Sequence, residues 1–333
     1  MRVLLSAIIL AALIWATAMA KDVQTKLPPI NSNARVHPVL AKGGMVAAQD
    51  RIAAQIGADI LRRGGNAVDA AVATGFALAV SHPQAGNIGG GGFMMISLVG
   101  EGEVVALDFR EMAPAAADRD MYLGPDGEVD NRRSQYSHLS AGVPGTVMGL
   151  LEALETYGTM TRRQVIGPAI RLAYEGFPIS ASLSASLAKH QDILFADPSS
   201  VAYFYKNDQS VPAPGYRLRQ KDLAATLRRI LKDGTDGFYG GKTAEFLLTE
   251  IKKGGGILAQ EDLDNYQVFT RKAVTGQYKG YEIASMPPPS SGGVHIIQML
   301  NILSGYDLKS DGHNSADYMH KLVEVMRLSL IHI

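Results

Sequence analysis

The order of helical and strand patterns between residues 44 and 109 constrains the fold most strongly. Residues 44–63 carry apolar side chains at helical spacing, and residues 67–80 follow as a second, alanine-rich helix that we expect to be buried. Residues 93–99 and 103–109 then alternate as two strands, joined by a short connection that contains glycine. Helices followed by hairpin strands, without regular alternation of strand and helix, favour a layered α+β fold over a parallel doubly wound sheet.

The rest of the chain is predicted to be mainly helical. One further strand, residues 277–286, leads into three consecutive prolines. We find no internal repeat, low-complexity segment or linker, so we expect one contiguous domain, although the middle helices could also form a lobe of their own. The candidate helices are residues 146–157, 162–175, 220–232, 242–253, 295–303 and 313–327.

A charged triplet lies at the end of the second strand of the predicted hairpin. Asp108, Arg110 and Glu111 lie where the alternating apolar run ends. A guanidinium group is permanently charged and presents a planar fork of donors, so an arginine held at a strand end can bind a small carboxylate through two parallel hydrogen bonds. Arg110 is therefore the first candidate for contacting a substrate. The plainer alternative is a surface ion pair between Arg110 and Asp108 or Glu111.

Motifs that bind cofactors or metals lack the surroundings they need. The glycines at 89–92 open a strand after a helix, whereas the dinucleotide fingerprint opens a helix, so we expect them to permit close backbone approach. Residues 240–243 lack the first glycine and the strand of a phosphate-binding loop. The histidines show no metal-binding spacing, and no Gly-x-Ser-x-Gly elbow is present. We therefore expect no metal, and these motifs support neither phosphate binding nor a serine-triad hydrolase.

The N-terminus carries a targeting pattern. Arg2 precedes an apolar run that ends in Ala18-Met19-Ala20, which is typical of a secretory signal peptide cleaved before Lys21. An uncleaved membrane anchor is the alternative, but the run is shorter than the ~20 residues that cross a bilayer. The chain has no cysteine, which excludes disulfides and a thiol nucleophile, and its zero net charge gives it no electrostatic reason to bind nucleic acid.

Four motifs occur together along the chain. They are Arg-Gly-Gly-Asn-Ala-Val-Asp-Ala-Ala at residues 63–71, Ser-His-Pro-Gln-Ala-Gly-Asn-Ile with four glycines and Phe-Met at 81–94, Asp-Phe-Arg-Glu-Met-Ala-Pro at 108–114, and Ser-Met-Pro-Pro-Pro-Ser-Ser-Gly-Gly at 285–293. With them, the chain resembles the large-subunit half of bacterial periplasmic γ-glutamyltranspeptidases (glutathione hydrolases). The resemblance implies the N-terminal nucleophile (Ntn) hydrolase fold, an αββα sandwich whose two antiparallel sheets are completed by a small subunit.

The same resemblance implies a mechanism without a cofactor. In the family, a threonine becomes the N-terminus of the small subunit when the precursor cleaves itself, and its free amine serves as general base. It attacks a γ-glutamyl amide, and the resulting ester passes the glutamyl group to water or to an amino acid or peptide acceptor. This threonine is expected beyond Ile333, so we assign no catalytic residue within the chain. Arg110 is implied to bind the α-carboxylate of the glutamyl group.

The expected layout of the chain has four parts: a signal peptide at residues 1–20, an N-terminal extension at 21–40, the large-subunit region at 41–327 and a tail at 328–333 that does not match the family. We expect the tail to end a truncated sequence, and the 333-residue chain to be inactive alone. The implied partners are glutathione and other γ-glutamyl compounds, acceptor amines, and the small subunit in a periplasmic or secreted heterodimer, with no nucleic acid.

Two other functions stay open. One is a related acylase that acts on β-lactam side chains such as glutaryl groups, since that branch shares the fold and the self-processing. The other is a secreted noncatalytic protein that binds glutamyl compounds through Arg110 alone.

Overall fold

The computed structural model describes residues 40–98, 100 and 102–331. The predicted signal peptide and nearly all of the predicted N-terminal extension lie outside the described residues. Contacts divide the chain into one unit of residues 1–43 and a second unit of residues 44–333. Residues 40–43 contain no helix or strand, so every element below belongs to the second unit.

The two helices that the sequence predicted begin this unit, but the first starts at Arg51 and not at residue 44, because Asp50 caps it there. The carboxylate of Asp50 accepts hydrogen bonds from main-chain N–H groups at the start of α2 (Arg51–Arg62). Asn66 begins α3 (Ala67–Ser81), where its side chain and that of Asp69 form a reciprocal capping box. Most residues of α3 are buried, because α2, α5 and α6 all pack against it. The predicted burial of the alanine-rich helix is confirmed.

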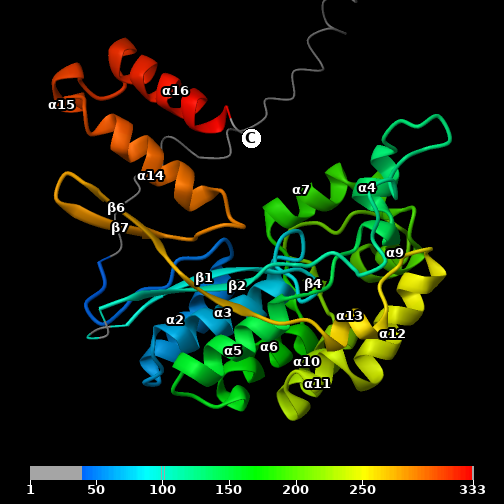
Figure 1. The fold of residues 1–333 in the computed structure, drawn as a ribbon. Helices are drawn as coiled ribbons and strands as arrows, with labels where there is room; N and C mark the ends of the chain where they lie inside the picture. The colour runs from blue at the N-terminus through cyan, green and yellow to red at the C-terminus, as the bar shows by residue number, and fades with distance from the viewer. Residues whose placement is uncertain (1–39, 99, 101, 332–333) are drawn as a thin grey trace, which may run out of the picture. The chain divides into compact units, whose positions relative to one another are not determined.

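A three-stranded antiparallel sheet lies against these helices. Its order is β1 (Gly92–Ser97), β2 (Val104–Phe109) and β5 (Phe269–Lys272), so a strand from the last quarter of the chain pairs with the predicted hairpin. Figure 1 shows α2, α3, α5 (Thr146–Tyr157) and α6 (Arg162–Glu175) on one side of this sheet.

The two faces of the sheet differ in character. Phe109 points toward the helices, where its ring lies so close to Gly149 of α5 that a Cβ there would be 2.1 Å from it. Phe93, Met95 and Phe269 are each 36% exposed and share the other face with Asp108, because residues paired across strands point the same way. One face is thus core, whereas on the other the outer strands β1 and β5 carry partly exposed apolar side chains beside the buried Asp108 of β2.

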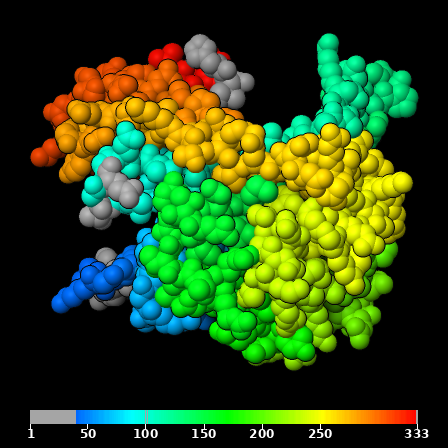
Figure 2. All heavy atoms as spheres, turned by 60° about the horizontal axis from the view of Figure 1, so that its bottom comes forward, coloured from blue at the N-terminus to red at the C-terminus, as the bar shows by residue number. Residues whose placement is uncertain are grey.

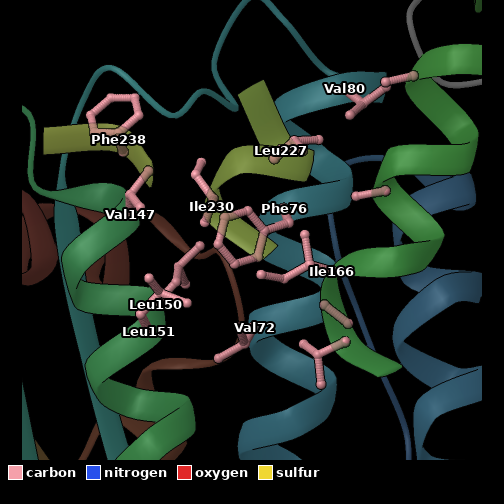
Figure 3. Packing of buried hydrophobic residues seen from close by; sticks show 14 of the residues in the cluster. Val72, Phe76, Val80, Val147, Leu150, Leu151, Ile166, Leu227, Ile230 and Phe238 are labelled. Atoms are coloured by element: carbon pink, nitrogen blue, oxygen red, sulfur yellow. The ribbon is translucent and has the colours of Figure 1, made fainter. Parts of the chain in front are cut away.

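Further helices extend the core beyond the sheet. Phe76 of α3 packs among Leu150 and Leu151 of α5 and Ile166 of α6 (Figure 3). α10 (Lys221–Asp233) packs against α6, and the green and yellow-green regions of the chain lie side by side in Figure 2. The remaining elements here are α4 (Asn131–Tyr136), the 3₁₀ helix His138–Ser140, β3 (Phe177–Pro178), α7 (Ala181–Lys189), α8 (Gln191–Leu194), α9 (Pro198–Phe204), β4 (Arg217–Leu218), α10 (Lys221–Asp233), α11 (Asp236–Tyr239), α12 (Gly241–Lys253) and α13 (Gln260–Asp264).

The predicted strand at residues 277–286 is instead a hairpin of two strands. β6 (Val274–Tyr278) pairs with β7 (Tyr281–Ser285), and the two-residue turn between them has φ angles of 49° at Lys279 and 85° at Gly280. Positive φ at both central residues produces the tight turn that suits a twisted hairpin. The prediction was wrong because lysine rarely occupies that position, so the turn carried no familiar signal.

Helices cover the β6–β7 hairpin on its far side. α14 (Gly292–Leu303) packs on both strands and on α16 (Ala316–Leu330), with α15 (Leu308–Asp311) between them in the chain. In Figure 1 the layers run from helices through the β1–β2–β5 sheet and the hairpin to α14 and α16. The α+β prediction is confirmed. No helix within the described residues is long and apolar enough to cross a membrane.

Candidate substrate-binding site

Arg110 directly follows β2, and hydrogen bonds hold its main chain on both sides. Its N–H donates to Asp108 Oδ1 at 3.1 Å, and its carbonyl oxygen accepts from the Tyr266 hydroxyl at 3.0 Å. Two residues further on, Met112 and Val143 exchange main-chain hydrogen bonds of 3.3 and 2.8 Å. The backbone that presents the Arg110 side chain is therefore fixed before any ligand arrives.

The glycine run at residues 89–92 packs directly against the main chain at this strand end. A Cβ at Gly91 would lie 2.5 Å from the Phe109 carbonyl oxygen and 2.6 Å from the Glu111 nitrogen. The carbonyl of Gly90 accepts hydrogen bonds from Gly145 and Thr146, at 2.7 and 2.9 Å, where α5 begins. The predicted close backbone approach is confirmed at Gly91, where any larger residue would displace the segment that carries Arg110.

Tyr266, which holds the carbonyl of Arg110, stacks on a second tyrosine, Tyr239. The rings of Tyr239 and Tyr266 lie 5.9 Å apart and nearly parallel. The Tyr239 hydroxyl donates to the Pro144 carbonyl at 2.8 Å. Burial raises the pKa of both phenols well above its ordinary value, and the charges of Asp108 and Glu111 add to the effect at Tyr266. Both hydroxyls therefore stay protonated and act as donors.

The guanidinium of Arg110 is exposed and lies beside the proline triplet. Its Nη1 donates to the carbonyl of Pro289 at 3.3 Å. The turn that contains the proline triplet is tightly packed, since a Cβ at Gly293 would lie 2.2 Å from the Met286 carbonyl oxygen. Among residues 40–331, with 99 and 101 left aside, no carboxylate lies within 4.0 Å of the Arg110 guanidinium.

Asp108 forms its ion pair with a different arginine, Arg271. Its Oδ2 lies 2.7 Å from Nε of Arg271 on β5, and the residue is only 4% exposed. The structure therefore contains neither the Asp108 nor the Glu111 ion pair that was the plainer alternative for Arg110. Most of the donors of the Arg110 guanidinium therefore have no partner among the described residues, and a carboxylate is the group that complements such a planar cationic fork.

The sequence did not single out Tyr266 or Arg271. Neither lies in a recognisable motif. Arg271 reaches the site because β5 pairs with β2, and Tyr266 lies shortly before β5 in the chain. The described part of the chain contains no group of three or more His, Asp or Glu side chains arranged to hold a metal ion.

Comparison with solved structures defines the class of protein. The fold matches the crystal structure of Helicobacter pylori γ-glutamyltranspeptidase with a TM-score of 0.86 and 46% sequence identity, over 88% of this chain and 84% of that one. The structure is thus of the Ntn-hydrolase class, with helical layers around sheets, as the resemblance implied.

Sequence comparison gives the family. The γ-glutamyltranspeptidase family model matches residues 53–332. The glutathione hydrolase proenzyme of Escherichia coli (strain K12) is 46% identical over 319 residues, which are 95% of this chain and 55% of that protein. The acylase ACY 1 proenzyme of Pseudomonas sp. (strain V22) is 40% identical over 298 residues, or 88% of this chain and 53% of that protein. The chain belongs to the γ-glutamyltranspeptidase family and spans about half the length of these curated relatives.

Proposed function

We propose that this chain is the large-subunit portion of a γ-glutamyltransferase and glutathione hydrolase, and that Arg110 binds the α-carboxylate of the γ-glutamyl donor. One observation carries the assignment of the site: Arg110 is fixed through its main chain, yet its guanidinium has no carboxylate partner among the described residues. Two parallel charge-assisted hydrogen bonds would orient the donor so that its γ-amide faces the nucleophile.

The chemistry then follows the family pattern. A threonine at the N-terminus of the small subunit, derived from the same precursor, attacks the γ-carbonyl while its own α-amine takes the hydroxyl proton. The amide C–N bond breaks, the leaving amine takes up a proton, and the glutamyl group remains as an ester. Water or the amine of an amino acid or peptide then cleaves that ester. No cofactor takes part.

A glutaryl acylase is the second candidate, because an acylase proenzyme is 40% identical to this chain. A glutaryl donor also ends in a carboxylate and differs from a γ-glutamyl donor by the missing α-amine. Arg110 could therefore bind either, and the preference must come from groups that bind the amine.

The discriminating experiment compares γ-glutamyl and glutaryl p-nitroanilide as substrates of the full-length precursor after maturation. We expect a higher kcat/KM for the γ-glutamyl donor. A higher value for the glutaryl donor would assign the protein to the acylase branch.

Partners and location follow from the same proposal. The donor is glutathione or another γ-glutamyl compound, the acceptor is water or an amine, and the protein partner is the small subunit from the same precursor. Residues 1–20 favour export, so the heterodimer would act in the periplasm or outside the cell. If the protein is instead a noncatalytic binding protein, the chain alone should bind glutamate tightly and the full-length product should not turn over either anilide.

A further inference from the structure

We propose that Arg271 is a positioning residue that neutralises Asp108 and thereby keeps the Arg110 guanidinium free for the donor carboxylate. This inference rests on the proposed function of Arg110. It concerns a residue on β5, far from the Asp108–Glu111 segment in sequence, that joins the site only through strand pairing.

Asp108 is a carboxylate that is almost completely shielded from solvent. It is 4% exposed, and both of its oxygens are engaged: Oδ1 accepts from the Arg110 N–H at 3.1 Å, and Oδ2 accepts from Arg271 Nε at 2.7 Å. Asp108 thus fixes the main chain of Arg110 and needs a cation nearby. A buried carboxylate without a partner is strongly unfavourable, so some positive group must supply the charge.

Strand register explains why Arg271 can supply that charge. Asp108 lies opposite Phe269, and Arg271 lies opposite Ala106, so Arg271 is the diagonal neighbour of Asp108 on the same sheet face. The small side chain of Ala106 leaves room for the arginine. The guanidinium carbon of Arg271 also lies 5.1 Å from the centre of the Phe269 ring, which holds it over the sheet.

Without Arg271, Arg110 is the cation best placed to replace it. Its main-chain nitrogen already lies 3.1 Å from the Asp108 carboxylate, and its long side chain can fold back onto that group. Such a contact would break the hydrogen bond to Pro289 and remove the fork from the donor. Loss of Arg271 should therefore impair donor binding, although Arg271 itself does not contact the donor.

The test uses the full-length, matured enzyme with Arg271→Gln, Asp108→Asn, the double variant and Arg271→Lys. Arg271→Gln should raise the donor KM about tenfold with kcat nearly unchanged. The double variant should recover most of that loss, since the asparagine side chain keeps an acceptor for the Arg110 N–H and no longer attracts the Arg110 guanidinium. Arg271→Lys keeps the charge and should keep KM within about twofold of the wild type.

A second donor separates this effect from a general distortion. With 4-aminobutyryl p-nitroanilide, which lacks the α-carboxylate, Arg271→Gln should leave KM unchanged. An equal rise for both donors, or a double variant with KM as high as that of Arg271→Gln, would overturn the proposal and leave Arg271 as a structural ion pair.

Two further outcomes are also decisive. If Arg271→Gln does not mature, an elevated KM in the double or the lysine variant still refutes the proposal, and wild-type values in both support it. If Arg110→Met itself leaves KM unchanged, the proposed role of Arg110 fails, which is distinct from a failure of Arg271.

Discussion

The Tyr266 hydroxyl donates a 3.0 Å hydrogen bond to the main-chain carbonyl of Arg110, although the two residues are 156 positions apart in the chain. This bond fixes the carbonyl of Arg110, while the Asp108 carboxylate fixes its N–H; together the two contacts form a frame around the Arg110 backbone. Gly145 makes room for it, because a Cβ there would lie 2.0 Å from both the Tyr266 hydroxyl and the Phe109 carbonyl oxygen. The frame holds the backbone and leaves the arginine side chain available.

Removing the Tyr266 hydroxyl should therefore affect donor binding. Tyr266→Phe is expected to destabilise the enzyme by about 1 kcal/mol and to raise the donor KM several-fold, because the Arg110 carbonyl loses its donor. Tyr239→Phe is the matched control: it removes a comparable hydroxyl, bonded to Pro144 at 2.8 Å, from the ring that stacks on Tyr266. We expect a similar loss of stability without a change in KM. Equal KM values for the two variants would contradict this role of Tyr266.

The glycine run offers a paired test of close approach. Gly91→Ala should destabilise the protein by about 2 kcal/mol or more and raise the donor KM, because the new methyl group meets main-chain atoms on both sides of Arg110. Gly89→Ala should have little effect, since a Cβ there meets no atom within 4 Å. Melting temperature and donor kinetics of the two variants check this, and equal destabilisation would show that the contact at Gly91 is unimportant.

Asp69 should make stability depend on pH. Burial raises the pKa of this carboxyl, but hydrogen bonds from Thr159, Asn66 and Met160 outweigh burial and bring the pKa below its ordinary value of 3.8. A group whose pKa is lowered by folding stabilises the fold above its unfolded pKa of about 3.9, and that contribution disappears as the pH falls through the folded value.

Asp69→Asn should accordingly lower stability by about 2 kcal/mol at neutral pH, and the difference from the wild type should shrink below pH about 4. Melting temperatures between pH 3 and 7 would measure it. Asp59→Asn, which changes an exposed carboxylate of α2, serves as the control. A difference for Asp69→Asn that stays constant over this range would show that the charge of Asp69 does not stabilise the fold.

Export is tested independently of the site. The pattern Ala18-Met19-Ala20 before Lys21 predicts that the exported protein begins at Lys21. Mass spectrometry of protein recovered from the periplasm or medium should find that N-terminus. An exported protein that still begins at Met1 would show that the segment is retained.

Local patterns predicted most of the fold, and long-range pairing explains the rest. Residues 146–157 and 162–175 were predicted with the bounds that the structure has, because the apolar spacing that defines each helix lies within the segment itself. Arg110 stood out because it follows a strand directly. Tyr266 and Arg271 did not, because their roles arise from the pairing of β5 with β2. No sequence window contains that pairing.

The end of the C-terminal helix also depends on contacts with a distant part of the chain. Residues 313–327 were predicted as a helix, and α16 extends from Ala316 to Leu330 without a break at residue 327. Ser329, which is 1% exposed, lies 2.8 Å from Nδ1 of His295 on α14. The spacing of apolar residues predicted that α16 is a helix, whereas the residue at which it ends depends on packing against α14.

Donor kinetics of the matured full-length enzyme test the role of Arg110 most directly. Arg110→Met should lower kcat/KM for the γ-glutamyl donor by on the order of a hundredfold, equivalent to about 3 kcal/mol, mainly through a higher KM. Arg110→Lys keeps the charge without the fork and should recover only part of this loss. Arg119→Met, whose side chain is 97% exposed, should have no effect. Self-cleavage should proceed in all three, because that step involves no substrate carboxylate. Donor kinetics unchanged in a matured Arg110→Met enzyme would contradict the assignment and leave Arg110 as an ordinary exposed arginine.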